Sequence, residues 1–496
     1  MNIWKKAEKD IIIHKNKLNI IASCIDRHAK NTPNKLALII NKKKYTYKKL
    51  QEEVNKFSNY LKLKNNSRVF IFLPKVPELY ISFLSIIQQG AIAIPLFEAF
   101  QTDGLELRLK KGDANVLITN KQLKKRLKQK IKGLKVITID KIKSKNKKFK
   151  TVLKNKYDTA LMIFTSSTAG TPVAGIQIPH YGLVQQHFTA KLVLDLKPND
   201  HYWCTAHPGW VTGSIYGIIA PLSIGCTNYI LTEHFNSKKW IDFIKNNKIS
   251  VIYTAPTALR LLKPDIKNSD LKIVRNLCSV GEALTKTTFD HYKKLGITIN
   301  DTYWQTETGA IVIANWPKLK KKPGSIGKPI GVKAKIKNKT ITLKPKWPSM
   351  MTGVYKHPKM YKSYFKNGWF LTKDLAKKDK DNYFFFEARE DDIIKSSGER
   401  ISPIEIESVL MKHKAVKEVA VIGVPDQIKG HILKAFIILN KNIIPSEKLK
   451  EELSLFVKNN YAGHSYPKII QFVKNLPKTN SGKIIRMKLR EINHSK

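Results

Sequence analysis

Residues 164–180, FTSSTAGTPVAGIQIPH, combine hydroxyl side chains and glycines directly after the apolar run Leu161–Phe164. Small residues allow backbone N–H groups to turn toward an anion, and hydroxyls add further donors. The segment lacks the G-x-x-x-x-G-K-[ST] pattern, which argues against a P-loop of the nucleoside-triphosphatase type. Taken alone, it fits a solvated serine/threonine turn better than a phosphate-binding loop.

A second polar segment lies at Ile299–Pro317, INDTYWQTETGAIVIANWP. Between Asp301 and Gly309 it places hydroxyl, amide, carboxylate and glycine close together, after the strand-like residues ITIN. Mg²⁺ prefers oxygen ligands, so Glu307 is a candidate for holding a hydrated Mg²⁺ ion. The alternative is a polar loop whose two aromatic residues fill the core.

A third segment carries an aspartate and two arginines. Asp374 follows the apolar strand in GWFLTKD, a position from which a carboxylate can bind both hydroxyls of a ribose. Arg389 and Arg400 are two of only ten arginines in the chain, which indicates sites that need planar donors. The alternative for Arg389 is a surface ion pair with Asp391 or Asp392, which contributes little stability.

The fourth segment is LPKTNSGKIIR, at Leu476–Arg486. Lys483 follows a Ser-Gly turn that can present its ammonium to a ligand. Because lysine is so common in this chain, the residue carries weight only together with its flanking motif.

The elements that position these segments alternate between strand-like and helical. Strands are expected at Arg68–Leu73, Ala91–Pro95, Val116–Thr119 and Val251–Thr254, with helices at Glu78–Gln89 and Trp240–Lys245. This order predicts βαβ units and a mostly parallel sheet. After about Lys333 short alternating strands appear, and beyond the charged turn AREDDIIKSSGER about a hundred residues have their own α+β pattern.

The composition is that of a folded cytoplasmic protein of more than one domain. The 496 residues are 42% hydrophobic and carry a formal net charge of +52. Lysine supplies 80 of the 90 basic residues and is scattered along the chain, whereas base recognition favours arginine, so no nucleic-acid partner is expected.

The four cysteines have no metal or redox spacing, which predicts reduced thiols. The N-terminus lacks an apolar signal core, and the apolar run Leu79–Phe97 fits a buried helix and strand better than a membrane span.

Together the four segments resemble the adenylate-forming superfamily of acyl-CoA synthetases, peptide-synthetase adenylation domains and luciferases, from about Ala29 to Arg490. The segments YWCTAHPGWVTGSIYG, VIYTAPTALR, CSVGEAL and DTYWQTETG are most similar to the acetyl-CoA synthetase family, in a short form. The resemblance implies a large α/β N-terminal domain (residues 1–388) of stacked sheets flanked by helices, with a small β-barrel-like part. It also implies a small mobile α+β C-terminal domain (residues 389–496) with a hinge near Asp391.

The resemblance further implies a two-step reaction that uses acetate, ATP with Mg²⁺, and CoA. The carboxylate attacks the α-phosphate of ATP, the small domain rotates, and the CoA thiol then attacks the acyl-AMP. Fixed cations and backbone donors would stabilise the charge that develops at phosphorus. The expected catalytic residues are Lys483, Glu307 and Thr306, with Glu307 meeting Mg²⁺.

The binding residues implied by the resemblance fall into five groups. The ATP/AMP group is Thr165, Ser166, Ser167, Thr168, Gly170, Gly281, Glu282, Ala283, Asp301, Thr302, Tyr303, Trp304, Gln305, Thr306, Asp374, Arg389 and Arg400. The acyl pocket is Val211, Thr212, Val280 and Trp304. The CoA group is Thr212, Ser397, Gly398 and Lys458. Asp391 is the hinge. Carbonyls of Met411, His413 and Val416 match a peripheral cation site.

Substrate size follows from the indole of Trp304, which would fill the volume that a longer acyl chain needs. A rigid wall excludes by overlap, whereas an open apolar pocket discriminates one methylene by only about 1–3 kcal/mol. Acetate is therefore the expected substrate, with propionate poorer.

The chain departs from the family's usual phosphate segment, T-S-G-[ST]-T-G-x-P-K-G. Ser167 replaces a glycine, and Val173-Ala174 stands where the family has one lysine. Lys373 and Ala388 replace glycines before Asp374 and Arg389, and Ala283 replaces a proline. The rest of the core set is present, so we expect an active enzyme in which a neighbouring lysine or Mg²⁺ neutralises the pyrophosphate.

Three alternatives remain open from the sequence. The first is a CoA ligase for another short acid such as propionate. The second is a catalytically impaired nucleotide-binding homologue. The third is a basic nucleic-acid-binding protein, for which the sequence offers no base-reading motif. The expected partners are small-molecule substrates, with no membrane, for a monomer or homodimer in the cytoplasm.

Overall fold

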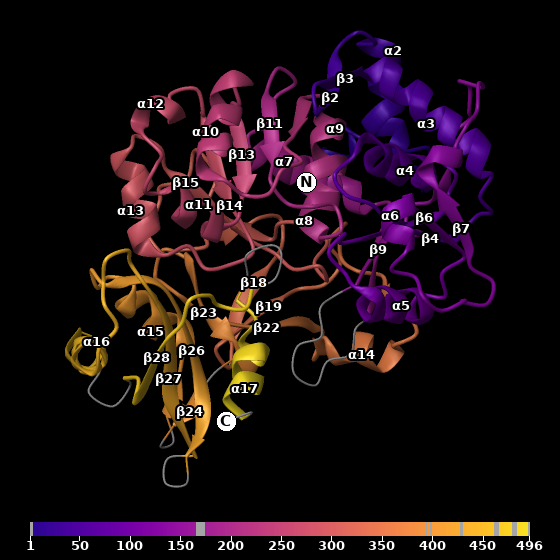
Figure 1. The fold of residues 1–496 in the computed structure, drawn as a ribbon. Coiled ribbons are helices and arrows are strands. Elements are labelled where there is room, and N and C mark those ends of the chain that lie inside the picture. The colour runs from indigo at the N-terminus through magenta and orange to yellow at the C-terminus, as the bar shows by residue number, and fades with distance from the viewer. Residues whose placement is uncertain are drawn as a thin grey trace.

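The structure is a computed structural model that describes residues 3–164, 174–392, 394–396, 399–426, 430–460, 466–478 and 484–494. Of residues 391, 395, 396, 399, 400, 430 and 494 only the backbone is described. Figure 1 shows the chain running from the indigo and purple N-terminal part through the central magenta part to the yellow C-terminal unit.

A nine-stranded sheet forms the centre of the molecule. Its inner strands pair in the order β2, β12, β11, β13, β14 and β15, and each of these pairs is parallel. In spatial order the strands are β17 (Lys328–Pro329), β16 (Ile313–Ala314), β15 (Ile299–Tyr303), β14 (Asn276–Ser279), β13 (Val251–Thr254), β11 (His201–Cys204), β12 (Thr227–Ile230), β2 (Leu36–Ile40) and β3 (Lys43–Thr46).

A seven-stranded sheet lies beside it and is also mainly parallel. Its strands are β20 (Gly353–Val354), β10 (Gly175–Pro179), β9 (Thr159–Phe164), β5 (Ile92–Leu96), β4 (Arg68–Phe72), β6 (Val116–Thr119) and β7 (Lys135–Thr138). One apolar core contains residues of both sheets and of the helices α3 (Tyr47–Leu61), α4 (Pro77–Gln88) and α7 (Gly182–Leu192). Helix α4 is buried along almost its whole length, so the apolar run Leu79–Phe97 is an internal helix followed by a strand, as predicted.

The remaining helices cover these sheets and their connections. They are α1 (Ile3–Glu8), α2 (Arg27–Asn31), α5 (Thr102–Lys111), α6 (Lys121–Lys124), α8 (Val211–Ser214), α9 (Ala220–Ile224), α10 (Ser237–Asn246), α11 (Pro256–Leu262), α12 (Asn268–Leu271), α13 (Lys286–Lys294) and α14 (Pro358–Ser363). A two-stranded pair joins β1 (Lys17–Leu18) to β8 (Lys154–Asn155). None of the helices within the described ranges combines the length and apolar character that crossing a bilayer requires.

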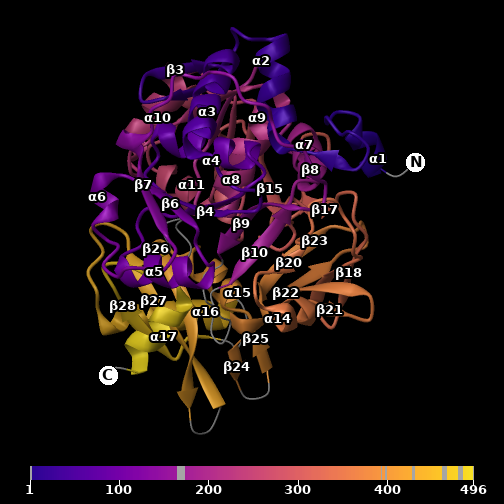
Figure 2. The same ribbon diagram turned by 90° about the vertical axis from the view of Figure 1, so that its right-hand side faces the viewer.

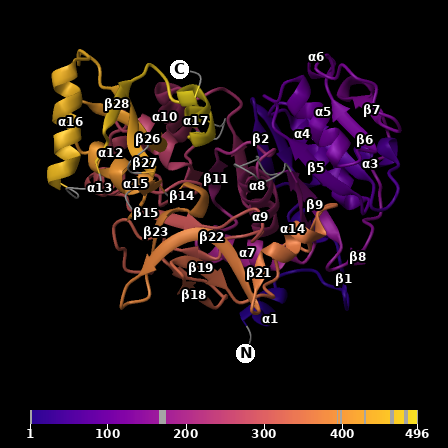
Figure 3. The same ribbon diagram turned by 90° about the horizontal axis from the view of Figure 1, so that it is seen from below.

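A five-stranded antiparallel sheet follows and occupies the place of the expected barrel-like part. It consists of β18 (Ala334–Lys337), β19 (Thr340–Leu343), β22 (Trp369–Lys378), β21 (Phe365–Lys366) and β23 (Phe384–Arg389). Seen from below, β22 forms an orange arch above β19 and β18 (Figure 3).

The C-terminal unit has its own core. It contains β24 (Ile394–Ser396), β25 (Glu399–Ile401), α15 (Pro403–Leu410), β26 (Val416–Asp426), β27 (Gly430–Leu439), α16 (Glu447–Asn460), β28 (Ile469–Phe472) and α17 (Arg486–His494). It lies below the nine-stranded sheet in Figures 1 and 2, and beside the five-stranded sheet in Figure 2. The predicted fold class is confirmed: an α/β protein of stacked sheets with a small α+β C-terminal unit. We keep the boundary at 388/389 and the hinge near Asp391 as a proposal.

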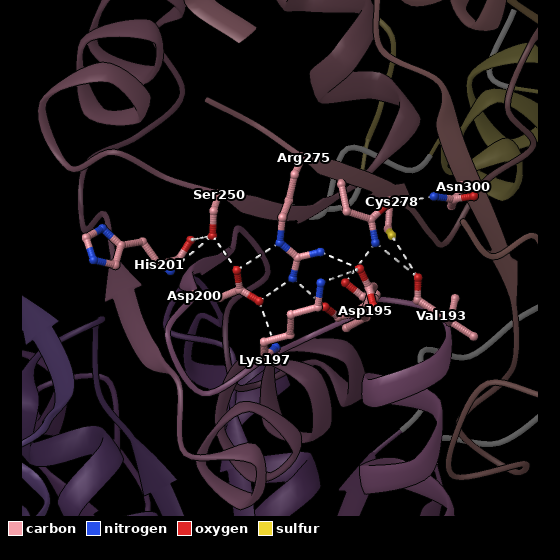
Figure 4. A network of polar contacts seen from close by, with 11 residues as sticks. Val193, Asp195, Lys197, Asp200, His201, Ser250, Arg275, Cys278 and Asn300 are labelled. Atoms are coloured by element: carbon pink, nitrogen blue, oxygen red, sulfur yellow. Dashed lines mark hydrogen bonds and ion pairs between the residues drawn. The ribbon is translucent and has the colours of Figure 1, made fainter. Parts of the chain in front are cut away.

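A polar network fastens the amino ends of three parallel strands (Figure 4). Asp200 precedes β11, Ser250 precedes β13 and Arg275 precedes β14. The Arg275 Nε donates to Asp200 Oδ1 at 3.0 Å, and its other nitrogens pair with Asp195 and Asp200. Ser250 Oγ donates to Asp200 Oδ1 at 2.9 Å. This network lies at the amino ends of the strands, so it leaves their carboxyl ends, at the opposite edge of the sheet, for a binding site.

Candidate active site

A cavity of about 1180 Å³ lies at the carboxyl ends of the parallel strands. Segments directly after β11, β13, β14 and β15 line one side of it, where ligands bind in open α/β sheets. Residues of α15, β26 and the start of α17 line it from the C-terminal unit, so the cavity lies between the two parts of the chain.

Most of the predicted binding residues that the structure describes meet in this cavity. They are Val211, Thr212, Val280, Gly281, Glu282, Ala283, Thr302, Tyr303, Trp304, Gln305, Thr306, Glu307, Asp374 and Arg389. They come from segments far apart in the sequence, and the strand order brings those segments to one edge.

Asp374 is the centre of a fixed polar group. It lies on β22 and is 5% exposed. Its Oδ2 accepts from the Tyr303 hydroxyl at 2.8 Å and from Gln305 Nε2 at 2.6 Å. Arg389, its partner in the register of β22 and β23, places Nε 3.7 Å from Asp374 Oδ1. The carboxylate is thus held in one orientation at the cavity wall, as a ribose-binding group requires.

Trp304, directly after the end of β15, also lines the cavity. Its Nε1 donates to the Tyr253 hydroxyl at 3.0 Å, and its ring meets the Tyr216 ring edge-on at 5.1 Å between centroids. Val211 and Thr212, which also line the cavity, begin the short helix α8. This helix packs closely on the preceding chain, because a Cβ on Gly213 would lie 2.2 Å from the His207 carbonyl oxygen. The indole is thus held by two tyrosines at the wall of the cavity that α8 also lines.

Asp301 lies behind the cavity wall and does not line it. The resemblance implied a nucleotide-binding role for Asp301 after the strand-like residues ITIN, whereas strand β15 continues to Tyr303. Asp301 Oδ1 accepts from Ser279 Oγ at 2.6 Å and from the Thr302 amide at 3.1 Å. Burial raises the pKa of Asp301 to about 7. In this structure Asp301 therefore joins β14 to β15.

Glu307 is an oriented carboxylate at the cavity wall. It lines the cavity next to Thr306, and its Oε1 accepts from the Tyr364 hydroxyl at 2.8 Å. Within the described residues, no three histidine, cysteine, aspartate or glutamate side chains cluster as a metal site. A single oriented carboxylate fits Mg²⁺, which takes one or two carboxylates together with substrate phosphates and water.

The segment Gly281–Ala283 forms a further part of the wall. Gly281 has φ +94°, a conformation that favours glycine, and open space around it. Glu282 accepts from Arg260 Nη2 at 2.9 Å, which fixes its carboxylate beside the cavity. Arg260 was not predicted as a site residue, although it ends the segment VIYTAPTALR and is one of only ten arginines.

The C-terminal unit adds ion pairs that the sequence did not predict. Arg486 Nη2 donates to both carboxylate oxygens of Glu407, at 2.6 and 2.7 Å, and Arg486 Nη1 lies 3.5 Å from Asp392 Oδ2. Burial raises the pKa of Glu407, and the guanidinium opposes that effect. Lys478 pairs with Glu418 at the same wall. Partners 60 or more residues apart leave no pattern in a single sequence.

Several predicted site residues lie outside the described part of the structure. They are Thr165, Ser166, Ser167, Thr168, Gly170, Ser397, Gly398 and Lys483, and for Arg400 and Asp391 only the backbone is described.

The structure places the remaining predicted residues away from the cavity, with one exception. Lys458 is exposed on α16, with Nζ 5.7 Å from the Tyr466 ring centre. His413 lies between α15 and β26, and Val416 is the first residue of β26. His413 Nε2 lies 3.0 Å from Glu452 Oε1. Met411 does line the cavity. The CoA and peripheral-cation roles of these residues stay predictions.

Family models and curated relatives point to the same enzyme family. Residues 25–347 match the AMP-binding enzyme family, and residues 405–483 match the AMP-binding enzyme C-terminal domain. The acetyl-coenzyme A synthetase of Bacillus subtilis is 41% identical, covering 96% of this chain and 90% of that protein. That of Methanothrix thermoacetophila is 34% identical, covering 95% and 82%.

A solved structure agrees with these relatives. The anthranilate CoA ligase AuaEII in complex with anthranoyl-AMP has a TM-score of 0.88 and 27% identity, covering 97% of this chain and 98% of that one. The chain therefore belongs to the AMP-binding enzymes and, among them, to the acetyl-coenzyme A synthetase family.

Proposed function

We propose that this protein ligates acetate to coenzyme A with ATP, through an acetyl-AMP intermediate, and releases AMP and pyrophosphate. The observation that supports acetate as the substrate is the fixed indole of Trp304 at the cavity wall. Its hydrogen bond to Tyr253 and its edge contact with Tyr216 hold the ring in one orientation, so that it would oppose a longer acyl chain.

In the first step an acetate oxygen attacks the α-phosphorus of ATP and pyrophosphate leaves. Asp374, held by Tyr303 and Gln305, would bind the ribose hydroxyls and so place the α-phosphate near Thr306. Lys483 would bridge the acetate and the α-phosphate. Glu307 would hold Mg²⁺, which when bound offsets the negative charge of the phosphates.

In the second step the thiol of CoA attacks the acetyl carbonyl carbon and AMP leaves. Thr212, Ser397 and Gly398 would contact the pantetheine arm and Lys458 a phosphate of CoA, after the C-terminal domain rotates about Asp391. The exposed position of Lys458, remote from the cavity, fits a residue that reaches its ligand only after that rotation.

We also propose that the protein acts in the cytoplasm on small molecules, as a monomer or homodimer and without nucleic-acid or membrane partners. The four cysteines support a reducing compartment, because each is buried with a free thiol.

The test is AMP formation with acetate, propionate and butyrate, with and without CoA, together with acetate-dependent ATP–pyrophosphate exchange. Acetate should give the highest rate, propionate a lower one and butyrate the lowest. Exchange should not require CoA. If saturating acetate, ATP and Mg²⁺ give no exchange, the protein is a nucleotide-binding homologue without the first step.

A further inference from the structure

Lys373 has a backbone conformation that lysine seldom adopts. It directly precedes Asp374 on β22 and has φ +59°. This left-handed region favours glycine and costs an L-residue with a Cβ about 1 kcal/mol. The position therefore keeps a lysine at a cost in stability.

The side chain of Lys373 belongs to the cavity. Lys373 lines it, and its Nζ lies 5.3 Å from the centre of the Tyr364 ring. The hydroxyl of the same ring donates to Glu307 Oε1 at 2.8 Å. One tyrosine thus contacts both the ammonium and the carboxylate that we assign to Mg²⁺.

Lys373 differs from the other lysines of the cavity wall in what surrounds its charge. Lys75 Nζ donates to the Thr205 carbonyl oxygen at 3.0 Å, and Lys478 forms an ion pair with Glu418. Lys373 has no carboxylate within ion-pair distance among the residues that the structure describes. Its charge is available for an anionic ligand.

ATP needs such a cation at its outer phosphates. The β- and γ-phosphates and the departing pyrophosphate concentrate negative charge, and the segment of residues 164–180 contains no lysine to meet it. The ligand chemistry that fits the Lys373 ammonium beside Glu307 is therefore a polyphosphate.

We propose that Lys373 binds the β/γ-phosphates of ATP and the pyrophosphate leaving group, in place of a lysine in the phosphate segment. This inference rests on the proposed function, because it assumes that ATP binds with Glu307 near its phosphates.

The test compares nucleotides that do and do not carry the outer phosphates. The dissociation constants of ATP with Mg²⁺ and of AMP are measured by calorimetry, without acetate or CoA. Lys373→Gly should weaken ATP binding about tenfold and leave AMP binding within about twofold. Lys373→Arg should retain most of the ATP affinity, because it keeps the charge.

Lys339→Gly is the matched control. Lys339 also has a left-handed φ of +61°, and it is exposed and does not line the cavity. Both glycine variants relieve the same backbone cost, so only Lys373→Gly should change nucleotide affinity. Asparagine also tolerates this conformation, so the nucleotide affinities of Lys373→Asn should match those of Lys373→Gly.

Equal weakening of ATP and AMP, or no weakening of either, overturns the proposal for Lys373. Its failure is distinguishable from failure of the proposed function. A wild-type protein that binds ATP but forms no AMP with acetate overturns the ligase activity, and the ATP-against-AMP comparison still decides the role of Lys373.

Discussion

Arginine side chains in this protein meet fixed sets of acceptors, although lysine supplies most of the positive charge. Arg27 donates to the carbonyls of Asp10 and Ser223, and Arg126 donates to those of Glu98 and Phe100. Among the arginines whose side chains the structure describes, Arg126, Arg260, Arg389 and Arg486 line the cavity. Scarcity of arginine therefore indicates a place where several acceptors converge, in loops as well as in the site.

The first prediction concerns Trp304→Gly. Removing the indole opens the end of the acyl pocket, so kcat/KM for octanoate should rise at least about tenfold and that for acetate should fall. Steady-state assays with both acids measure this. Trp304→Phe is the control, because it retains most of the wall and should still exclude octanoate. A Trp304→Gly enzyme that keeps its acetate preference and gains nothing on octanoate contradicts the assignment.

The second prediction concerns Asp301→Asn and pH. Burial raises the pKa of Asp301 from 3.8 in the unfolded chain to about 7 in the fold. The folded protein then binds the extra proton, so the contribution of Asp301 to stability is greatest below pH ~4 and is lost as pH rises from ~4 through ~7. Asp301→Asn keeps an acceptor for Ser279 and removes the titration.

Urea unfolding at pH 5 and pH 8 measures this difference. The stability of the wild type relative to Asp301→Asn should fall between the two pH values. Asp265→Asn, at an exposed position, should follow the wild type. An unchanged difference between wild type and Asp301→Asn would show that Asp301 does not titrate in this range.

The sequence predicted the residues of the site that lie within a motif, and missed those whose role depends on a distant partner. Asp374, Tyr303 and Gln305 belong to two motifs, and the structure joins them by hydrogen bonds. Tyr364 lies in no quoted motif, and Tyr253 lies in VIYTAPTALR without an assigned role. Their roles arise because the fold places a hydroxyl beside Glu307 or Trp304.

At the scale of elements, periodicity and apolar runs predicted the central strands within one or two residues. The expected strand Arg68–Leu73 is β4, Arg68–Phe72, and Val116–Thr119 agrees with β6. The strand β15 was predicted too short, because its last residues are polar. Hydrogen bonds to Ser279 and Asp374 stabilise those polar side chains inside the sheet, and such bonds cannot be inferred from composition.

The third prediction concerns the network at the amino ends of the strands. Asp200 is buried, and Arg275→Ala leaves its carboxylate without the guanidinium (Figure 4). The free energy of unfolding should fall by about 3 kcal/mol, since the remaining charge is buried and unpaired. Arg275→Lys should recover only part of the loss, because one ammonium cannot reach both aspartates.

Chemical denaturation measures the stability and acetate-dependent AMP formation measures the activity. Activity at low temperature should stay near that of the wild type, because the network lies at the edge of the sheet opposite the cavity. Lys286→Ala removes an exposed ion pair with Asp290 and should cost about 0.5 kcal/mol at most. An Arg275→Ala protein as stable as Lys286→Ala would show that the network contributes little.

At the scale of the whole molecule, the cavity belongs to two parts of the chain whose described residues form separate apolar cores. The C-terminal core begins at Ile394, after the last strand of the five-stranded sheet ends at Arg389. Polar groups connect the parts, such as the Ser402 hydroxyl that donates to the Glu387 carbonyl at 2.6 Å. An interface of this kind allows one part to rotate against the other.

The fourth prediction concerns Glu407→Gln in the C-terminal unit. The segment that follows Lys483 is fastened through Arg486 to Glu407 on α15 and to Asp392 next to the proposed hinge. Loss of the Glu407 charge leaves Arg486 with one carboxylate, so the segment that carries Lys483 should be held less firmly. If Lys483 acts only in the first step, ATP–pyrophosphate exchange should fall about tenfold or more, because misplacement of a catalytic group lowers the rate steeply.

The second step provides the internal control for Glu407→Gln. Thioester formation from supplied acetyl-AMP and CoA should stay within about twofold of the wild type, because that step uses the rotated domain without Lys483. Glu452→Gln, which removes an exposed carboxylate paired with His413 in the same unit, should leave both half-reactions unchanged. Equal losses in both half-reactions would indicate that the Arg486–Glu407 pair stabilises the C-terminal unit as a whole and does not position Lys483.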